Sequence, residues 1–87
     1  MAIQTPTFDA KPNWEPLERT VASIHRPDFM HMGRIGTIQL YKHRNTRRYV
    51  NIDALSGSCF EYRNGEYFPI DFECAMRYVL ETSWKSY

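Results

Sequence analysis

The stretch EYRNGEYF, residues 61–68, decides the fold. Its centre, Asn64-Gly65, is typical of a two-residue type I′ hairpin turn, because both residues tolerate the positive φ angles that this turn requires. A turn of this type places Tyr62 opposite Tyr67 on two antiparallel strands. The sequence therefore predicts a β-hairpin in the second half of the chain.

Two further strands are predicted upstream of this hairpin. Alternating apolar and polar residues place them near residues 35–42 and 48–53, on either side of a polar tip. The hairpin itself contributes strands near residues 59–63 and 66–70. The expected fold class is α+β, with a small four-stranded antiparallel β-meander packed against a C-terminal helix.

The register of the first two strands sets which side chains share a face. If Lys42 lies opposite Arg48, the aliphatic pairs Leu40–Val50 and Ile38–Ile52 gather on one face of the sheet. The same register places Tyr41 opposite Tyr49 on the other face. If Tyr62 and Tyr67 share that face, the sheet presents four tyrosines on which bases can stack.

Two helices are expected outside the sheet. The N-terminal helix begins after Asn13, a candidate N-cap, and ends before Pro27, since a residue that precedes proline disfavours the α conformation. A connecting segment then leads to the first strand. The C-terminal helix begins after Asp71 as its N-cap. Its apolar stripe, which we expect to face inward, consists of Phe72, Ala75, Met76, Val79 and Leu80.

Length and composition limit the organisation of the chain. With 87 residues it forms one compact domain, which we expect over residues 13–87 after a loose N-terminal arm, residues 1–12. The fractions of hydrophobic and charged residues, 43% and 24%, are typical of a globular protein. No apolar run is long enough for a membrane span and no signal peptide is evident, so a soluble cytoplasmic protein is expected. Cys59 and Cys74 are too few for a disulfide scaffold.

Charge is concentrated in the middle of the sequence. Residues 29–52 carry five basic and no acidic side chains, whereas both flanks carry more acids than bases. Basic residues contact phosphates, and aromatic rings stack on unpaired bases, so a basic hairpin flanked by tyrosines favours single-stranded nucleic acid or a nucleoprotein as partner. The candidate nucleic-acid-binding residues are Tyr41, Lys42, His43, Arg44, Arg47, Arg48 and Tyr49.

Two alternatives stand beside this prediction. The hairpin tip can be an ordinary solvated surface, with arginines paired to acids and the tyrosines packed as core. The second alternative is a protein–protein adaptor or inhibitor that docks through an aromatic surface, including Phe8, Trp84 and Tyr87, or that forms a homodimer.

No catalytic or cofactor signature is present in the sequence. Motifs such as GxSxG, HExxH and phosphate-binding glycine loops do not occur, so we expect a binding protein rather than an enzyme, without a cofactor. His25, Asp28 and His31 have a spacing of three, but Pro27 breaks the helix that would align them. We therefore expect no metal site.

Overall fold

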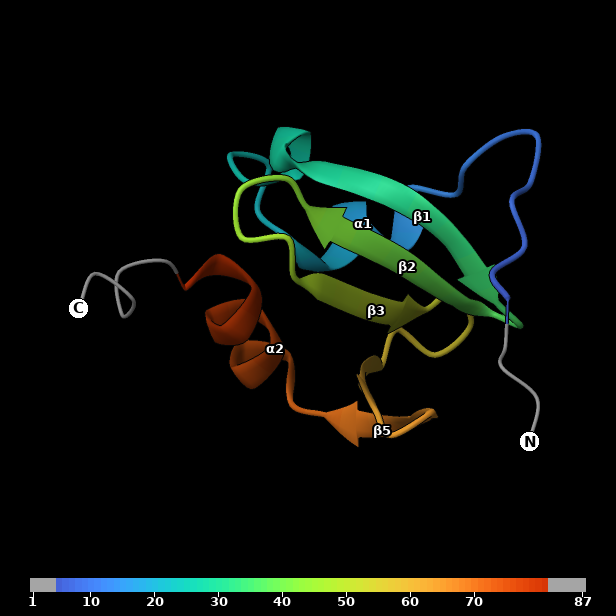
Figure 1. The fold of residues 1–87 in the computed structure, drawn as a ribbon. Helices are drawn as coiled ribbons and strands as arrows, with labels where there is room; N and C mark the ends of the chain where they lie inside the picture. The colour runs from blue at the N-terminus through green and yellow to red at the C-terminus, as the bar shows by residue number, and fades with distance from the viewer. Residues whose placement is uncertain (1–4, 82–87) are drawn as a thin grey trace.

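The computed structural model describes residues 5–81, which form a five-stranded antiparallel sheet and two α-helices (Figure 1). The strands pair in chain order. They are β1 (Phe29–Ile35), β2 (Ile38–His43), β3 (Tyr49–Asp53), β4 (Cys59–Arg63) and β5 (Glu66–Ile70). The helices are α1 (Glu15–Thr20) and α2 (Phe72–Leu80), with a short 3-10 helix, η1 (Arg26–Asp28), before β1. The α+β class and the antiparallel meander are confirmed, whereas Trp84 and Tyr87 lie outside the described residues.

The sheet has one strand more than the four predicted, because β1 is a strand and not a connecting segment. Gly36, with φ +60°, turns the chain between Ile35 and Ile38, which lie opposite each other. Glycine at the first central position is typical of a type II′ hairpin turn. The β1–β2 register shifts between His31 and Arg34. Because such an irregularity interrupts the alternation of side chains, the sequence pattern did not indicate a strand here.

The hairpin between β4 and β5 is confirmed. Asn64 and Gly65 have φ angles of +52° and +84°, as a type I′ turn requires. Tyr62 lies opposite Tyr67 in the ladder.

The predicted register between β2 and β3 is wrong by one residue. His43, and not Lys42, is the residue opposite Arg48, since its N–H donates to the Arg48 carbonyl at 2.8 Å. The loop is therefore shorter than expected, and Arg47 closes it in the left-handed conformation with φ +66°. A slip of one residue exchanges the two faces of one strand relative to the other. Tyr41 consequently lies opposite Val50 instead of opposite Tyr49.

The N-terminal helix is shorter than predicted. It ends at Thr20, and Val21 is already extended, with φ −104° and ψ 133°. The Arg26 guanidinium donates to the backbone carbonyls of Glu18 and Val21 at 2.8 Å each, so a side chain satisfies two carbonyls near the end of the helix. Ile24, which falls within the predicted helix, lies beyond its observed end and is 77% exposed.

The C-terminal helix agrees closely with its prediction. The Asp71 carboxylate accepts a hydrogen bond from the Glu73 N–H at 3.1 Å, which is the expected N-cap interaction. Ala75 and Val79 are buried, and Met76 and Leu80 pack against the core. Phe72, in contrast, is more than one third exposed and lies outside the inward stripe.

Both helices contribute to one core on one face of the sheet, and α1 lies behind β1–β3 in Figure 1. We call this side the packed face. Its buried residues are Leu17, Val21, Phe29, Tyr41, Val50, Ile52, Cys59, Ala75 and Val79. Among the described residues no helix combines the length and apolar character needed to cross a bilayer.

The N-terminal segment is attached to the edge of β1. Thr7 and Arg34 exchange two backbone hydrogen bonds of 2.8 and 2.9 Å, and the Arg34 guanidinium binds the Asp9 carboxylate. Gly33 lies so close to this segment that a Cβ atom there would be 2.8 Å from the Pro6 Cβ. The division at residue 12 into an arm and a domain stays a prediction.

Candidate nucleic-acid interface

Tyr41 belongs to the core and not to a surface. Its side chain is fully buried, and its hydroxyl donates a hydrogen bond to the Asn13 carbonyl. Burial also raises the pKa of Tyr41 well above its ordinary value. A base therefore has no access to this ring, and Tyr41 does not share a face with the other predicted tyrosines.

His43 holds the β2–β3 loop together from inside. It is 5% exposed, and its Nδ1 accepts hydrogen bonds from the N–H groups of Asn45 and Thr46 at 3.2 and 3.3 Å. The ring also packs edge-on against Phe29, with centroids 5.1 Å apart. Burial lowers the pKa of His43, so the neutral ring that can accept these bonds is favoured. His43 thus positions the loop but does not face solvent.

The four remaining basic residues of the predicted site point in different directions. Arg44 forms an ion pair with Asp28 at 3.0 Å. The Arg48 guanidinium donates to the Tyr78 carbonyl at 2.7 Å and lies over the Tyr78 ring. Lys42 and Arg47 are described below with the pocket that they border.

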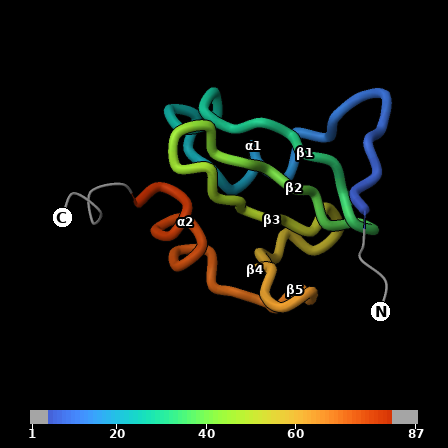
Figure 2. The backbone as a smooth tube through the Cα atoms, in the orientation of Figure 1, coloured from blue at the N-terminus to red at the C-terminus, as the bar shows by residue number. Residues whose placement is uncertain are grey.

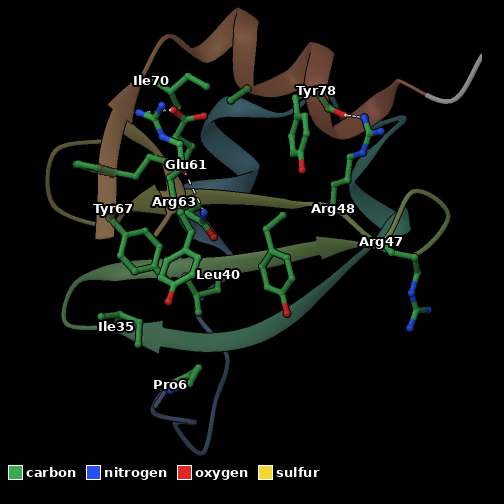
Figure 3. Close-up of a pocket in the computed structure, with 15 residues that line it drawn as sticks. Pro6, Ile35, Leu40, Arg47, Arg48, Glu61, Arg63, Tyr67, Ile70 and Tyr78 are labelled. Atoms are coloured by element: carbon green, nitrogen blue, oxygen red, sulfur yellow. Dashed lines mark hydrogen bonds and ion pairs between the residues drawn. The ribbon is translucent and has the colours of Figure 1, made fainter. Parts of the chain in front are cut away.

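A pocket of about 630 Å³ occupies the face of the sheet opposite the core (Figure 3). We call this side the open face. Leu40 and Asn51, both 3% exposed, are its most deeply buried lining residues, and Tyr78 reaches it from α2. Aromatic side chains make up much of the remaining wall, and these are Tyr49, Phe60, Tyr62 and Tyr67. The structure thus brings together three of the four predicted tyrosines.

The three tyrosines that line the pocket from the sheet, Tyr49, Tyr62 and Tyr67, lie close together. The rings of Tyr62 and Tyr67 are 5.0 Å apart at an interplanar angle of 57°. Burial is the main cause that raises the pKa of Tyr67, and the neighbouring hydroxyls of Tyr62 and Tyr49 raise it further. Tyr49 is nevertheless 39% exposed and Tyr62 56% exposed, so their rings remain accessible to a ligand.

The pocket lies where two strands of the sheet separate. Within residues 5–81, the β3–β4 ladder stops at the pair Asn51–Phe60, whereas β4 and β5 stay paired as far as their turn. In an uninterrupted antiparallel ladder, the next hydrogen-bonded pair would be Tyr49 and Tyr62. These two tyrosines instead flank the separation, and the β4–β5 hairpin turns away from β3 (Figure 2).

Asn51 carries an unpaired acceptor at the point of separation. Its Nδ2 donates to the Phe60 carbonyl at 3.1 Å. Its Oδ1 is buried and has no hydrogen-bond partner among the described residues. A buried acceptor without a partner destabilises the folded state by about 1 to 3 kcal/mol. The Asn51 oxygen is therefore a polar group that the packing around it does not satisfy.

Positive charge borders the aromatic pocket. Lys42 lies over the Tyr49 ring, with Nζ 5.8 Å from the centroid, and Arg63 lies over the Phe68 ring at 4.7 Å. Arg47 and Arg48 also belong to the lining of the pocket. The side chain of Arg47 extends away from the other labelled side chains in Figure 3. Glu61, which pairs with Arg63 at 3.2 Å, is the acid among these lining residues.

Several lining residues were not predicted from the sequence. Phe60 lies two residues before the predicted Tyr62 on β4, so the period of a strand could have indicated Phe60. Arg63 follows Tyr62 directly and would have been expected on the other face. Asn51 lies within a predicted strand, but nothing in a single sequence distinguishes its side chain from that of a solvated asparagine. Tyr78 could not be placed without the packing of α2 against the sheet.

The metal-site hypothesis gains no geometric support from the described residues. Asp28 is committed to Arg44, and the Nε2 of His31 lies 2.8 Å from the Gln39 Oε1. No group of three or more His, Cys, Asp or Glu with the geometry of a metal site occurs within residues 5–81.

Comparisons of the chain with protein-family models, with curated proteins and with solved structures gave no match.

Proposed function

We propose that the protein binds single-stranded nucleic acid through the open face of its sheet. The observation that carries the proposal is the aromatic pocket, in which Tyr49, Tyr62 and Tyr67 line one concave surface with cationic side chains beside them. Stacking on aromatic rings contributes about 1 to 3 kcal/mol per base and requires bases that are not already stacked in a duplex. The basic β2–β3 loop then serves as the border of the site rather than its centre.

Phosphate contacts complete this surface. Lys42 and Arg47 present an ammonium and a guanidinium group at the border of the pocket, and such groups contact the backbone of a strand whose bases stack. Arg44 and Arg63 contribute less in this arrangement, since they form ion pairs with Asp28 and Glu61. Binding should therefore fall as salt rises, because phosphate contacts release counterions.

The experiment is a titration of labelled single-stranded and duplex oligonucleotides, followed by fluorescence anisotropy at increasing salt. Tyr62→Ala should weaken single-strand binding by about 1 to 3 kcal/mol with little change in the salt dependence. Phe8→Ala is the matched control, because Phe8 is also exposed but lies outside the pocket lining. We expect Phe8→Ala to bind as the natural protein does.

A second pair of variants separates phosphate contacts from general charge. Arg47→Ala should weaken binding and flatten the salt dependence by about one counterion. Arg19→Ala removes the same charge from α1, on the packed side, and should have little effect. If the natural protein binds no oligonucleotide at low salt, or if Arg19→Ala weakens binding as much as Arg47→Ala, the proposal is wrong. Absence of all nucleic-acid binding would favour the alternative of a protein partner for the aromatic surface.

A further inference from the structure

We infer that Asn51 makes the open face selective for nucleobases with an exocyclic amino group, of which one is bound where β3 and β4 separate. This inference rests on the proposed function and assigns a specificity-determining residue to it. The amino group of the base would donate a hydrogen bond to the Asn51 Oδ1.

The orientation of the Asn51 amide is set by the sheet. Its Nδ2 donates across to the Phe60 carbonyl at 3.1 Å, which leaves the oxygen as the unpaired atom. If the amide were reversed, its oxygen would face the carbonyl oxygen of Phe60, and two acceptors would repel each other. The site therefore presents an acceptor, and a ligand that pairs with it must supply a donor.

The separation of the strands puts this acceptor within the aromatic site. Asn51 and Phe60 form the last pair of the β3–β4 ladder, and Tyr49 and Tyr62 would form its next hydrogen-bonded pair if the ladder continued. A flat ring that stacks on either tyrosine can direct its edge towards the last pair. Stacking and a single hydrogen bond are then available to the same base.

An acceptor of this kind favours amino groups over imide N–H groups. The amino group of adenine or cytosine projects from the ring edge and can approach an oxygen directly. The imide N–H of thymine or uracil is recessed between two carbonyl oxygens, which would approach the oxygens of Asn51 and Phe60. The preference is therefore for adenine or cytosine over thymine.

Binding must expose the Asn51 oxygen. In this structure the atom is closed off from solvent, whereas Tyr49 and Tyr62 are 39% and 56% exposed. Exposed side chains change rotamer within nanoseconds, and these two tyrosines line the same pocket as Asn51, so the inference requires that side-chain movement in this pocket uncovers the oxygen.

The experiment uses two single-stranded oligonucleotides of equal length that differ in one chemical group. One contains deoxyadenosines, and the other contains purine deoxynucleosides, which lack the 6-amino group but keep the fused ring. For the natural protein we expect the purine oligonucleotide to bind about threefold to tenfold more weakly. This ratio of dissociation constants corresponds to the free energy of one lost hydrogen bond. For Asn51→Leu, which removes the acceptor at similar volume, the two should bind equally.

The outcomes distinguish this inference from the proposed function. If both oligonucleotides bind the natural protein equally and tightly, Asn51 is not selective and this inference alone is wrong. If neither oligonucleotide binds at low salt, the proposed function and the inference fail together. Should Asn51→Leu not fold, the comparison of the two oligonucleotides on the natural protein still decides the matter.

Discussion

The two faces of the sheet use the same strands and the same residue types in opposite ways. On the packed face, the hydroxyl of the buried Tyr41 is paired with the Asn13 carbonyl. On the open face, Tyr49 and Tyr62 remain partly exposed, and the oxygen of the buried Asn51 has no partner. Aromatic content alone therefore does not distinguish a core face from a candidate binding surface, whereas exposure and unpaired polar groups separate the two faces here.

The comparison extends to His31, Gln39 and His43 on the packed face. The Nε2 of His31 lies 2.8 Å from the Oε1 of Gln39, and the Nδ1 of His43 accepts hydrogen bonds from the loop backbone. Buried polar groups are usually satisfied in this way because an unpaired group destabilises the fold. The open face departs from this rule at Asn51, in the middle of its aromatic lining. The packed face thus satisfies its buried polar groups, whereas the open face leaves the acceptor of Asn51 unpaired.

The largest expected difference between the two faces is tested by replacing one tyrosine on each face. Tyr41→Ala leaves a cavity in the core and an unpaired Asn13 carbonyl, so we expect a loss of about 3 to 5 kcal/mol in the free energy of unfolding. Tyr62→Ala removes a ring that is more than half exposed and should cost less than about 1 kcal/mol. Urea denaturation of both variants measures the difference. Equal losses would show that the open face is also part of the core.

Asn51→Leu tests the same difference between the faces, but here we expect a smaller change, and an increase in the free energy of unfolding rather than a loss. The substitution removes a buried acceptor without a partner and keeps a similar volume, although it also removes the hydrogen bond to the Phe60 carbonyl. We expect the free energy of unfolding to rise by about 1 kcal/mol. Leu40→Ala, at a neighbouring buried position of the same face, is the control and should lower it by about 2 to 4 kcal/mol. A clear loss of stability in Asn51→Leu would mean that the amide is needed for the fold.

The parts of the fold that the sequence predicted have local causes. The Asn64-Gly65 turn and the Asp71 cap depend on residues that are neighbours in the chain, so their patterns were sufficient. The strand β1 was missed because its register shift near Gly33 hides the alternation.

The error in the β2–β3 register had a larger consequence for the site. Loop length depends on Arg47, a non-glycine residue in the left-handed conformation, and on the buried Nδ1 of His43, which binds the loop backbone. Neither feature is visible in a single sequence. The slip of one residue moved Tyr41 from the expected tyrosine face into the core. Which tyrosines form the open face therefore had to come from the structure.

The smallest expected effect concerns His43, where the packed face supports the loop that borders the open face. Burial lowers the pKa of His43 below its ordinary value of about 6.5, so the neutral form is favoured in the folded protein. The unfolded chain therefore takes up a proton at higher pH than the folded protein does. Its contribution to stability is complete above about pH 6.5 and is lost as the pH falls through the folded-state pKa.

Urea denaturation at several values between about pH 7 and pH 4.5 measures this loss, since the ordinary pKa of aspartate lies lower, at about 3.9. The control is His43→Asn, because an asparagine oxygen can accept the Asn45 and Thr46 N–H bonds and does not titrate. We expect this variant to be less stable at neutral pH, since it loses the contact with Phe29, but to show a flatter pH dependence over the same range. If its stability falls with pH as steeply as that of the natural protein, another group is responsible, and His43 is not the acid-sensitive support of the loop.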